Sequence, residues 1–327
     1  MIRSKGDQII DDGKRRYINI TDTTNRDFFL HAKLLSSIKP IIGYDFALFS
    51  YSSEYYFVLI GSETPVFFND DLITVNLDEG IFLAIISDLK ITLLKDISET
   101  KIQDFYNYYD DPYSGHDFDD LKKFFLPICV YKITLSNNTN FDIALNKLAI
   151  DFFASNSDTT ILPLSSDCRD YFLLLTYTTG DIIPIGNVLR SVNASTWVYC
   201  FLDLYRCIEN LYDLGKIYKH YDSFKDQYCF SDFYGKLGNT LNHKANEIEA
   251  LTVLVSLIDN HITPLLNHVL VGNEKEETFI YRVRNNIVHH RNDTENVDFD
   301  NEEWNKIIIF LLSSINFLYE KFEDVVA

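Results

Sequence analysis

Apolar residues in the C-terminal part of the chain recur at the spacing of a helix with one buried face. From Ser195 they return every three or four residues until Gly215, where the run ends. This pattern predicts an amphipathic helix that stops at the glycine. The residues of the expected apolar face are Trp197, Phe201, Leu204, Ile208 and Leu211.

The same spacing predicts three more helices downstream, which together indicate a compact helical bundle. They are expected at residues 240–270, at residues 278–290, and from about residue 300 onward. Pro264 is expected to kink or break the first of them, because proline lacks an N–H and clashes with the preceding turn. The acidic run at residues 274–277 suits the start of the second, where the helix dipole favours negative charge.

The N-terminal half has a different pattern, which recurs after a shift of 115 residues. The coincidences include Asn25 with Asn140 and Phe57 with Phe172. Each copy is interpreted as a strand, a Thr-Asn turn that opens a helix, and two further strands. These elements are expected at residues 17–20, 26–38, 46–50 and 55–60, and again at residues 131–135, 141–153, 161–164 and 171–177.

The predicted fold class is therefore α+β, with two tandem repeated small α+β subdomains before a C-terminal all-α helical bundle. We place the domains at residues 1–100, 101–188 and 189–327. A chain of 327 residues with 46% hydrophobic content can bury two or three cores. The acidic, tyrosine-rich segment at residues 104–120 is expected to be a flexible surface connector, with a partner-docking strip as the alternative.

Cysteine usage and hydropathy predict a soluble cytoplasmic protein. The five cysteines show no CxxC pair and no metal-ligand spacing, and we see no signal peptide, so reduced thiols are expected. The longest apolar stretch, residues 307–318, contains polar residues and is too short to span a bilayer. No membrane partner is expected.

Residues 284–289 read Arg-Asn-Asn-Ile-Val-His and carry the candidate chemistry. Positions i and i+5 of a helix are about 500° apart, so Arg284 and His289 would lie on neighbouring faces of a helix end. A fixed cation and a titratable proton carrier can act there on one phosphodiester. The alternative is that Arg284, His289 and His290 only offset the dipole of a helix C-terminus.

A second charged pair, Arg206 and Glu209, lies on the first predicted bundle helix at i,i+3 spacing. Taken without any other argument, it is more simply a surface ion pair of small energetic weight. His261 and His268 are seven residues apart, but Pro264 intervenes and no carboxylate completes a metal site, so no metal and no cofactor are expected.

The R-x4-H spacing, with an asparagine after the arginine, resembles the signature of HEPN-superfamily ribonucleases. Together with the upstream R-x2-E pair and the three-part layout, the chain resembles the RnlA/LsoA-like toxins of phage-defence toxin–antitoxin systems. The residues that this resemblance implies for the active site are Arg206, Glu209, Arg284 and His289, with Asn285 and His290 as secondary candidates. The HxY variant, whose tyrosine a nucleotidyltransferase antitoxin modifies, is absent.

The resemblance implies a metal-independent endoribonuclease toxin in antiphage or stress defence. The ribose 2′-OH would attack the adjacent phosphorus, with His289 as general acid or base and Arg284 stabilising the phosphoryl charge. Arg206 would assist at the phosphate, and Glu209 would either orient a neighbour or take a proton. The expected partners are RNA, a second copy of the chain and a protein antitoxin. The alternative is a non-catalytic HEPN interaction or dimerisation protein.

The net charge of −19 opposes RNA binding, because phosphate neutralisation supplies much of the affinity in such complexes. A local positive cluster at residues 282–291 is expected to offset it, since dimerisation would bring two such clusters into one cleft. We therefore expect weak, salt-sensitive RNA affinity. The same acidity favours an antitoxin with a basic contact face.

Overall fold

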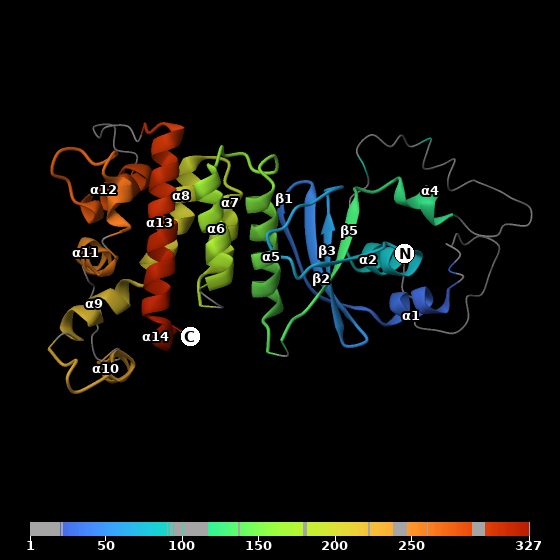
Figure 1. Cartoon of the computed structure of the whole chain (residues 1–327), viewed down its shortest axis with the longest axis horizontal. Helices are drawn as coiled ribbons and strands as arrows, with labels where there is room; N and C mark the ends of the chain where they lie inside the picture. Colours follow the sequence, from blue (N-terminus) through green and yellow to red (C-terminus); the bar gives the residue numbers. More distant parts are fainter. Residues whose placement is uncertain are drawn as a thin grey trace, which may run out of the picture. The chain divides into compact units, whose positions relative to one another are not determined.

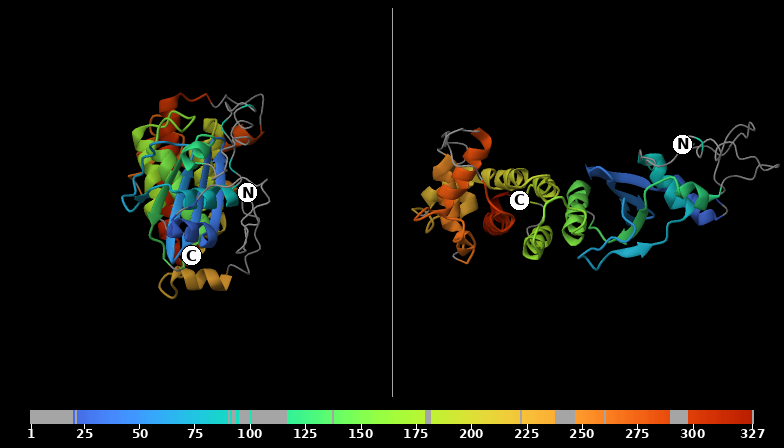
Figure 2. Two further views of the ribbon diagram at one scale, coloured as in Figure 1. Left: turned by 90° about the vertical axis from the view of Figure 1, so that its right-hand side faces the viewer. Right: turned by 90° about the horizontal axis from the view of Figure 1, so that it is seen from above.

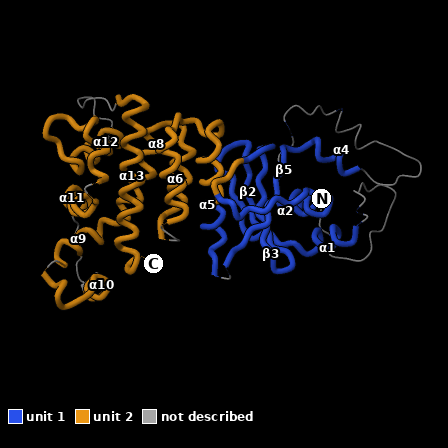
Figure 3. The backbone as a smooth tube through the Cα atoms, viewed as in Figure 1, with its two compact units in different colours: residues 1–65, 69–145 blue, residues 66–68, 146–327 orange. Residues whose placement is uncertain are grey.

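The chain has an α+β fold in which an antiparallel sheet precedes a mostly helical region, as the computed structural model in Figure 1 shows. The structure describes residues 20, 22–89, 91, 94, 100, 117–136, 138–178, 182–221, 223–237, 247–259, 261–289 and 298–326. It forms two compact units, one of residues 1–65 and 69–145 and one of residues 66–68 and 146–327 (Figure 3). No helix in the described ranges is long and apolar enough to cross a membrane.

The first unit is built on a five-stranded sheet of order β1-β2-β3-β5-β4, with antiparallel pairing throughout. The strands are β1 (Lys33–Ile41), β2 (Tyr44–Tyr51), β3 (Glu54–Ile60), β4 (Ile73–Val75) and β5 (Ile128–Ile133). Ser52 and Ser53 form the tight turn between β2 and β3, both with positive φ, as the twist of a two-residue hairpin requires.

Helices α1 (Thr23–His31) and α2 (Glu79–Asp88) cover one face of this sheet, as Figure 2 shows. Phe28 of α1 and Ile81 of α2 share a core with Val58 of β3. The two helices approach closely at Gly80, where an added Cβ would lie 1.9 Å from the Asn25 carbonyl oxygen. A short helix, α4 (Phe118–Lys122), precedes β5.

The second unit is helical and is organised around one long, buried helix, α13 (Asn301–Lys321). Asp300 caps α13 in a capping box with Glu303, which explains why it begins where the sequence predicts. Helices α6 and α8 pack against it. The other elements are α5 (Phe141–Ser155), α6 (Ser166–Thr178), α7 (Ile185–Val192), α8 (Trp197–Glu209), α9 (Tyr212–Tyr221), α10 (Phe230–Leu237), α11 (Glu247–Leu257), η1 (Thr263–Leu266), α12 (Glu276–His289) and α14 (Glu323–Val326).

The predicted repeat does not appear as two copies of one topology. The second copy begins with β5 and α5 as expected, but both of its later strands, predicted at residues 161–164 and 171–177, are wrong. Residues 161–164 form no strand, and α6 occupies residues 166–178. In the first copy, the helix predicted at residues 26–38 is wrong in extent, since α1 ends at His31 and β1 follows. The first strand, residues 17–20, falls almost wholly outside the described residues.

The sheet also joins segments that the sequence places in different domains. β5, from the predicted second domain, pairs with β3 and β4 of the first. The boundary between the two units lies within α5, not at residues 100 and 188. The connector predicted at residues 104–120 is largely outside the described residues.

Residues 66–68 form a strap that belongs to the second unit although its neighbours in sequence belong to the first. The Phe68 N–H donates to Oδ1 of the buried Asp151 at 2.8 Å, and the Val66 N–H donates to Oδ1 of Asn156 at 3.0 Å. Phe67 lies against the ring of Phe152. The strap is thus fixed along α5 by both polar and aromatic contacts.

The bundle helices agree only in part with their predicted positions, since the helix predicted at residues 240–270 ends as α11 at Leu257, before Pro264. α12 and α13 lie where expected, and the predicted apolar residues Leu251, Leu254 and Val255 of α11 are buried. Gly215, however, does not end a helix. α8 ends at Glu209, and Gly215 is buried inside α9, where an added Cβ would lie 3.0 Å from Cγ of Leu254.

All five cysteines are free.

Candidate functional site

Helices α8, α11 and α12 bring Arg284 together with two carboxylates. Nη2 of Arg284 lies 3.6 Å from Oε1 of Glu209, at the end of α8. Nη1 lies 3.7 Å from Oε2 of Glu247, the first residue of α11. The ion pair with Glu209 joins two residues that the sequence had placed in one site, whereas Glu247 had not been anticipated.

Arg284 is the most enclosed member of this group, with 18% of its side chain exposed against 30% for Glu209 and 47% for Glu247. Its Nη1 also donates to Oδ1 of Asn285 at 3.0 Å. Asn285, a secondary candidate, therefore helps to hold the guanidinium in place.

Burial raises the pKa of the Glu209 carboxyl, and this effect outweighs the opposing attraction of Arg284. Like-charge repulsion from Glu247 raises this pKa further, whereas attraction to Arg206 lowers it. Glu209 consequently accepts a proton more readily than an ordinary glutamate does. A carboxyl with this property beside a cation is suited to proton transfer.

Two tyrosines support the same region from α8 and α9. The hydroxyls of Tyr205 and Tyr212 lie 2.5 Å apart, and their rings meet edge to face. Burial raises the pKa of Tyr205 to about 12 and also raises that of Tyr212. Both hydroxyls therefore stay protonated at neutral pH and add no charge beside Glu209.

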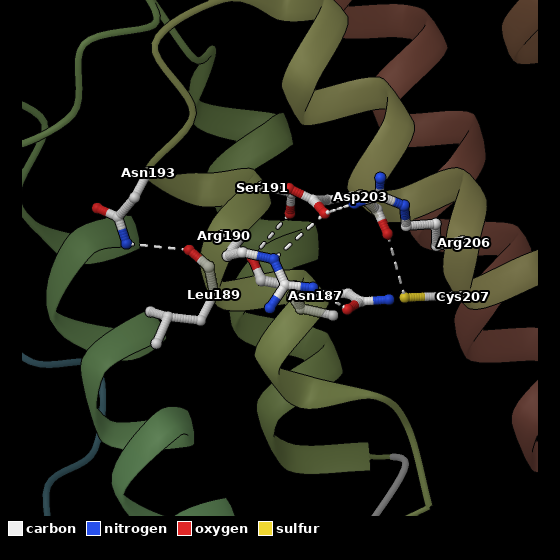
Figure 4. Close-up of polar contacts among 9 residues, drawn as sticks. Asn187, Leu189, Arg190, Ser191, Asn193, Asp203, Arg206 and Cys207 are labelled. Atoms are coloured by element: carbon white, nitrogen blue, oxygen red, sulfur yellow. Dashed lines mark hydrogen bonds and ion pairs between the residues drawn. The ribbon is translucent and has the colours of Figure 1, made fainter. Parts of the chain in front are cut away.

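Arg206 lies in a neighbouring cluster and not in contact with Arg284. Its Nη1 forms an ion pair with Oδ1 of Asp203 at 2.8 Å, and Nε of Arg190 from α7 lies 3.3 Å from the same oxygen (Figure 4). Arg206 acts on Glu209 only through the longer-range attraction that lowers its pKa. Among the predicted catalytic residues whose side chains are described, Arg284 and Glu209 thus lie in one cluster and Arg206 in an adjoining one.

His289 is the last residue of α12, five positions after Arg284. Its imidazole, and the whole of His290, lie outside the described part of the chain. The proton carrier of the predicted site therefore has its backbone at the end of the helix that carries Arg284, as the sequence indicates.

The described part of the expected positive cluster is compensated by carboxylates. Nε and Nη2 of Arg282 donate to the two oxygens of Glu274 at 2.9 and 3.0 Å, and its guanidinium lies over the Phe279 ring. Arg284 already has two acidic neighbours. Neither arginine therefore adds uncompensated positive charge to the cluster expected at residues 282–291.

His261 and His268 lie on either side of η1. Within the described ranges no group of three histidine, cysteine, aspartate or glutamate side chains is arranged to hold a metal ion.

Glu247, Asp203 and Arg190 are the charged residues of these clusters that sequence reasoning missed. For Asp203 a signal was present, since it precedes Arg206 by the same three residues by which Glu209 follows it. Comparison of the chain with protein-family models, with curated proteins and with solved structures gave no match.

Proposed function

We propose that the protein is a metal-independent endoribonuclease of the HEPN type that acts as a cytoplasmic toxin in antiphage or stress defence. The observation that carries the proposal is the ion pair between Arg284 and Glu209. It links the R-x4-H segment of α12 to the R-x2-E segment of α8. One residue of each pattern thus contacts one residue of the other although the patterns lie far apart in the chain, which supports the proposal that they act together.

In the proposed reaction the ribose 2′-OH attacks the adjacent phosphorus and the bond to the 5′ oxygen breaks. His289 takes the proton from the 2′-OH or supplies one to the departing 5′ oxygen. Arg284 stabilises the negative charge that develops on the phosphoryl oxygens. The products are a 2′,3′-cyclic phosphate and a 5′-hydroxyl end.

The two carboxylates beside Arg284 have different roles in this scheme. Glu247 is the more exposed, so its ion pair is the weaker and the more readily exchanged for a phosphodiester. Glu209 is more buried and stays in place, where its carboxylate orients Arg284 and its raised pKa helps that carboxylate to take up a proton.

The decisive experiment is RNA cleavage by purified protein with and without EDTA. His289→Ala and Arg284→Ala are each expected to lower cleavage by at least ~100-fold, because a methyl group neither shuttles a proton nor holds phosphoryl charge. Arg282→Ala removes a cation from the same helix and serves as the matched control, which should keep most of the activity. Circular dichroism verifies folding. Full activity in either site variant would overturn the proposed site, and loss of activity in EDTA would overturn the metal-independent mechanism.

A second candidate function, a non-catalytic interaction protein, is favoured by one observation. Arg284 is already neutralised by Glu209 and Glu247, as in a purely structural ion-pair network. The same experiment separates the two candidates. A wild-type protein that leaves RNA intact under every condition tested supports the interaction protein.

A further inference from the structure

The cluster on α7 and α8 is organised around one carboxylate with two guanidinium groups. Asp203 is buried on α8, and its Oδ1 receives Nε of Arg190 from one side and Nη1 of Arg206 from the other (Figure 4). The backbone carbonyl of Asp203 also accepts a weak bond from the Cys207 thiol at 3.6 Å. Asn187, one turn before Arg190 on α7, accepts from Nη2 of that arginine.

Charge and exposure distinguish this cluster from the other ion pairs of the bundle. Two arginines share one aspartate, so the cluster keeps a net positive charge in a chain whose net charge is −19. Both arginine side chains are 57% exposed, whereas the aspartate is 12% exposed. The carboxylate thus lies beneath two guanidinium groups that still present N–H donors to solvent.

We propose that Arg190 and Arg206, positioned by Asp203, bind a phosphate of the RNA strand next to the one that is cleaved. This inference rests on the proposed ribonuclease function and adds Arg190 and Asp203 to it. Arginine suits the role because its planar fork of donors matches phosphate oxygens, and because it keeps its charge at any physiological pH.

The position of the cluster along α8 supports an RNA strand over a separate small anion. Arg206 and Glu209 are one turn apart, and side chains at this spacing have their Cβ atoms about 5 to 6 Å from each other. Glu209 in turn contacts Arg284. A strand whose scissile phosphate lies at Arg284 would therefore extend along α8 toward Arg206 and Arg190.

The test measures RNA binding separately from cleavage. The affinity of a fluorescein-labelled single-stranded RNA is followed by anisotropy across a range of salt concentrations, in the His289→Ala background so that the probe stays intact. Adding Arg190→Gln is expected to weaken binding about 10-fold, the effect of losing one charged hydrogen-bonded contact. It should also reduce the slope of log affinity against log salt by about 0.7, the value for one phosphate of a single strand.

Two further variants exclude a merely structural role. Arg190→Lys keeps the charge and should restore the salt slope, although a lysine lacks the fork. Lys306→Gln removes a cation that is paired with Glu302 on α13, and should leave both affinity and slope unchanged. Thermal unfolding of each variant shows whether the contact between α7 and α8 has been lost.

Unchanged affinity and slope in Arg190→Gln would overturn the inference while leaving the ribonuclease proposal intact, provided that the wild-type protein cleaves RNA. If wild-type protein binds RNA through Arg190 without cleaving it, the proposed function fails, and Arg190 and Arg206 form an RNA phosphate site that is not next to a cleaved bond. Absence of RNA binding at low salt would overturn the inference.

Discussion

At the scale of single residues, Glu209 combines two opposing influences. Burial disfavours its negative charge, while Arg284 favours it, and the net result is a raised pKa. Glu247 contacts the same arginine from a more exposed position, and its carboxylate stays in water on one side. The two acids therefore differ in burial although they share a partner.

The raised pKa of Glu209 predicts that the effect of Glu209→Gln on the stability of the protein depends on pH. The folded-state pKa of Glu209 lies above its unfolded value, so the wild-type protein loses stability as pH rises from about 4.3, the ordinary carboxyl value, through the folded-state pKa. Glutamine does not titrate. The variant should therefore gain stability relative to wild type as pH rises through that window, and the difference should level off above it.

Thermal unfolding as a function of pH checks this expectation. Glu247→Gln is the matched control for the loss of an ion pair, because it removes the other carboxylate partner of Arg284 from a more exposed position. If the stability of Glu209→Gln relative to wild type fell as pH rose, the attraction of Arg284, and not burial, would dominate the pKa of Glu209.

Residue identity allowed only part of the site to be predicted. The resemblance, and not the spacing alone, suggested one site for Arg284 and Glu209, and the two side chains lie 3.6 Å apart. The pairing of Arg206 with Glu209 was wrong, because Asp203 lies at the same separation along the helix and is the residue that Arg206 contacts. Glu247 could not be predicted, because no sequence motif relates its position to that of Arg284.

At the scale of elements, the close packing of α9 on α11 depends on Gly215. An added Cβ would lie 3.0 and 3.1 Å from two carbons of Leu254 and 3.2 Å from the carbonyl oxygen of Ala250. The backbone oxygen cannot move without disturbing α11. Glycine is therefore required here by the separation of two helices, although it is a poor helix former.

We predict that Gly215→Ala destabilises the protein by about 1 to 3 kcal/mol, the usual cost of overpacking. Gly235→Ala is the control. Gly235 also lies in a helix, α10, but no atom lies within 4 Å of its added Cβ, so alanine there should stabilise by about 0.5 to 1 kcal/mol. Urea unfolding of both variants measures the two effects, and equal effects would contradict the close approach of the helices.

Element types were predictable where caps and periodicity agreed. Asp300 and Glu303 mark the start of α13, and its apolar residues follow a helical period. At α6 the signals conflicted. Residues 171–177 are nearly all apolar or aromatic and resemble a strand, but the side chain of Ser165 accepts from the Cys168 N–H and opens a helix. The buried positions Cys168, Phe172 and Leu175 then follow the helical spacing.

At the scale of the whole molecule, the net charge of −19 governs association with partners. Two copies of an acidic chain repel each other at long range, so self-association must come from a local surface and should strengthen as salt screens the repulsion. RNA binding should respond in the opposite direction, because salt weakens phosphate contacts. A protein antitoxin with a basic face would be attracted at long range by the net negative charge of the chain.

We predict a symmetric homodimer in which the two Arg284/His289 pairs face one cleft, since two such pairs hold an RNA strand better than one. Light scattering across the micromolar range should give twice the monomer mass, with the dimer favoured at higher salt. A strictly monomeric protein that cleaves RNA at full rate would contradict this arrangement.

The strap of residues 66–68 has a consequence for how the chain folds during synthesis. Its hydrogen bonds to Asp151 and Asn156 span 83 and 90 residues of sequence. The strap therefore leaves the ribosome long before its partners exist, while the β2–β3 hairpin can close at once from neighbouring residues. We expect early, local formation of the hairpin and late completion of the helical unit. A fragment that begins at residue 146 would then lack the strap that packs along α5, because the strap is encoded upstream of the cut.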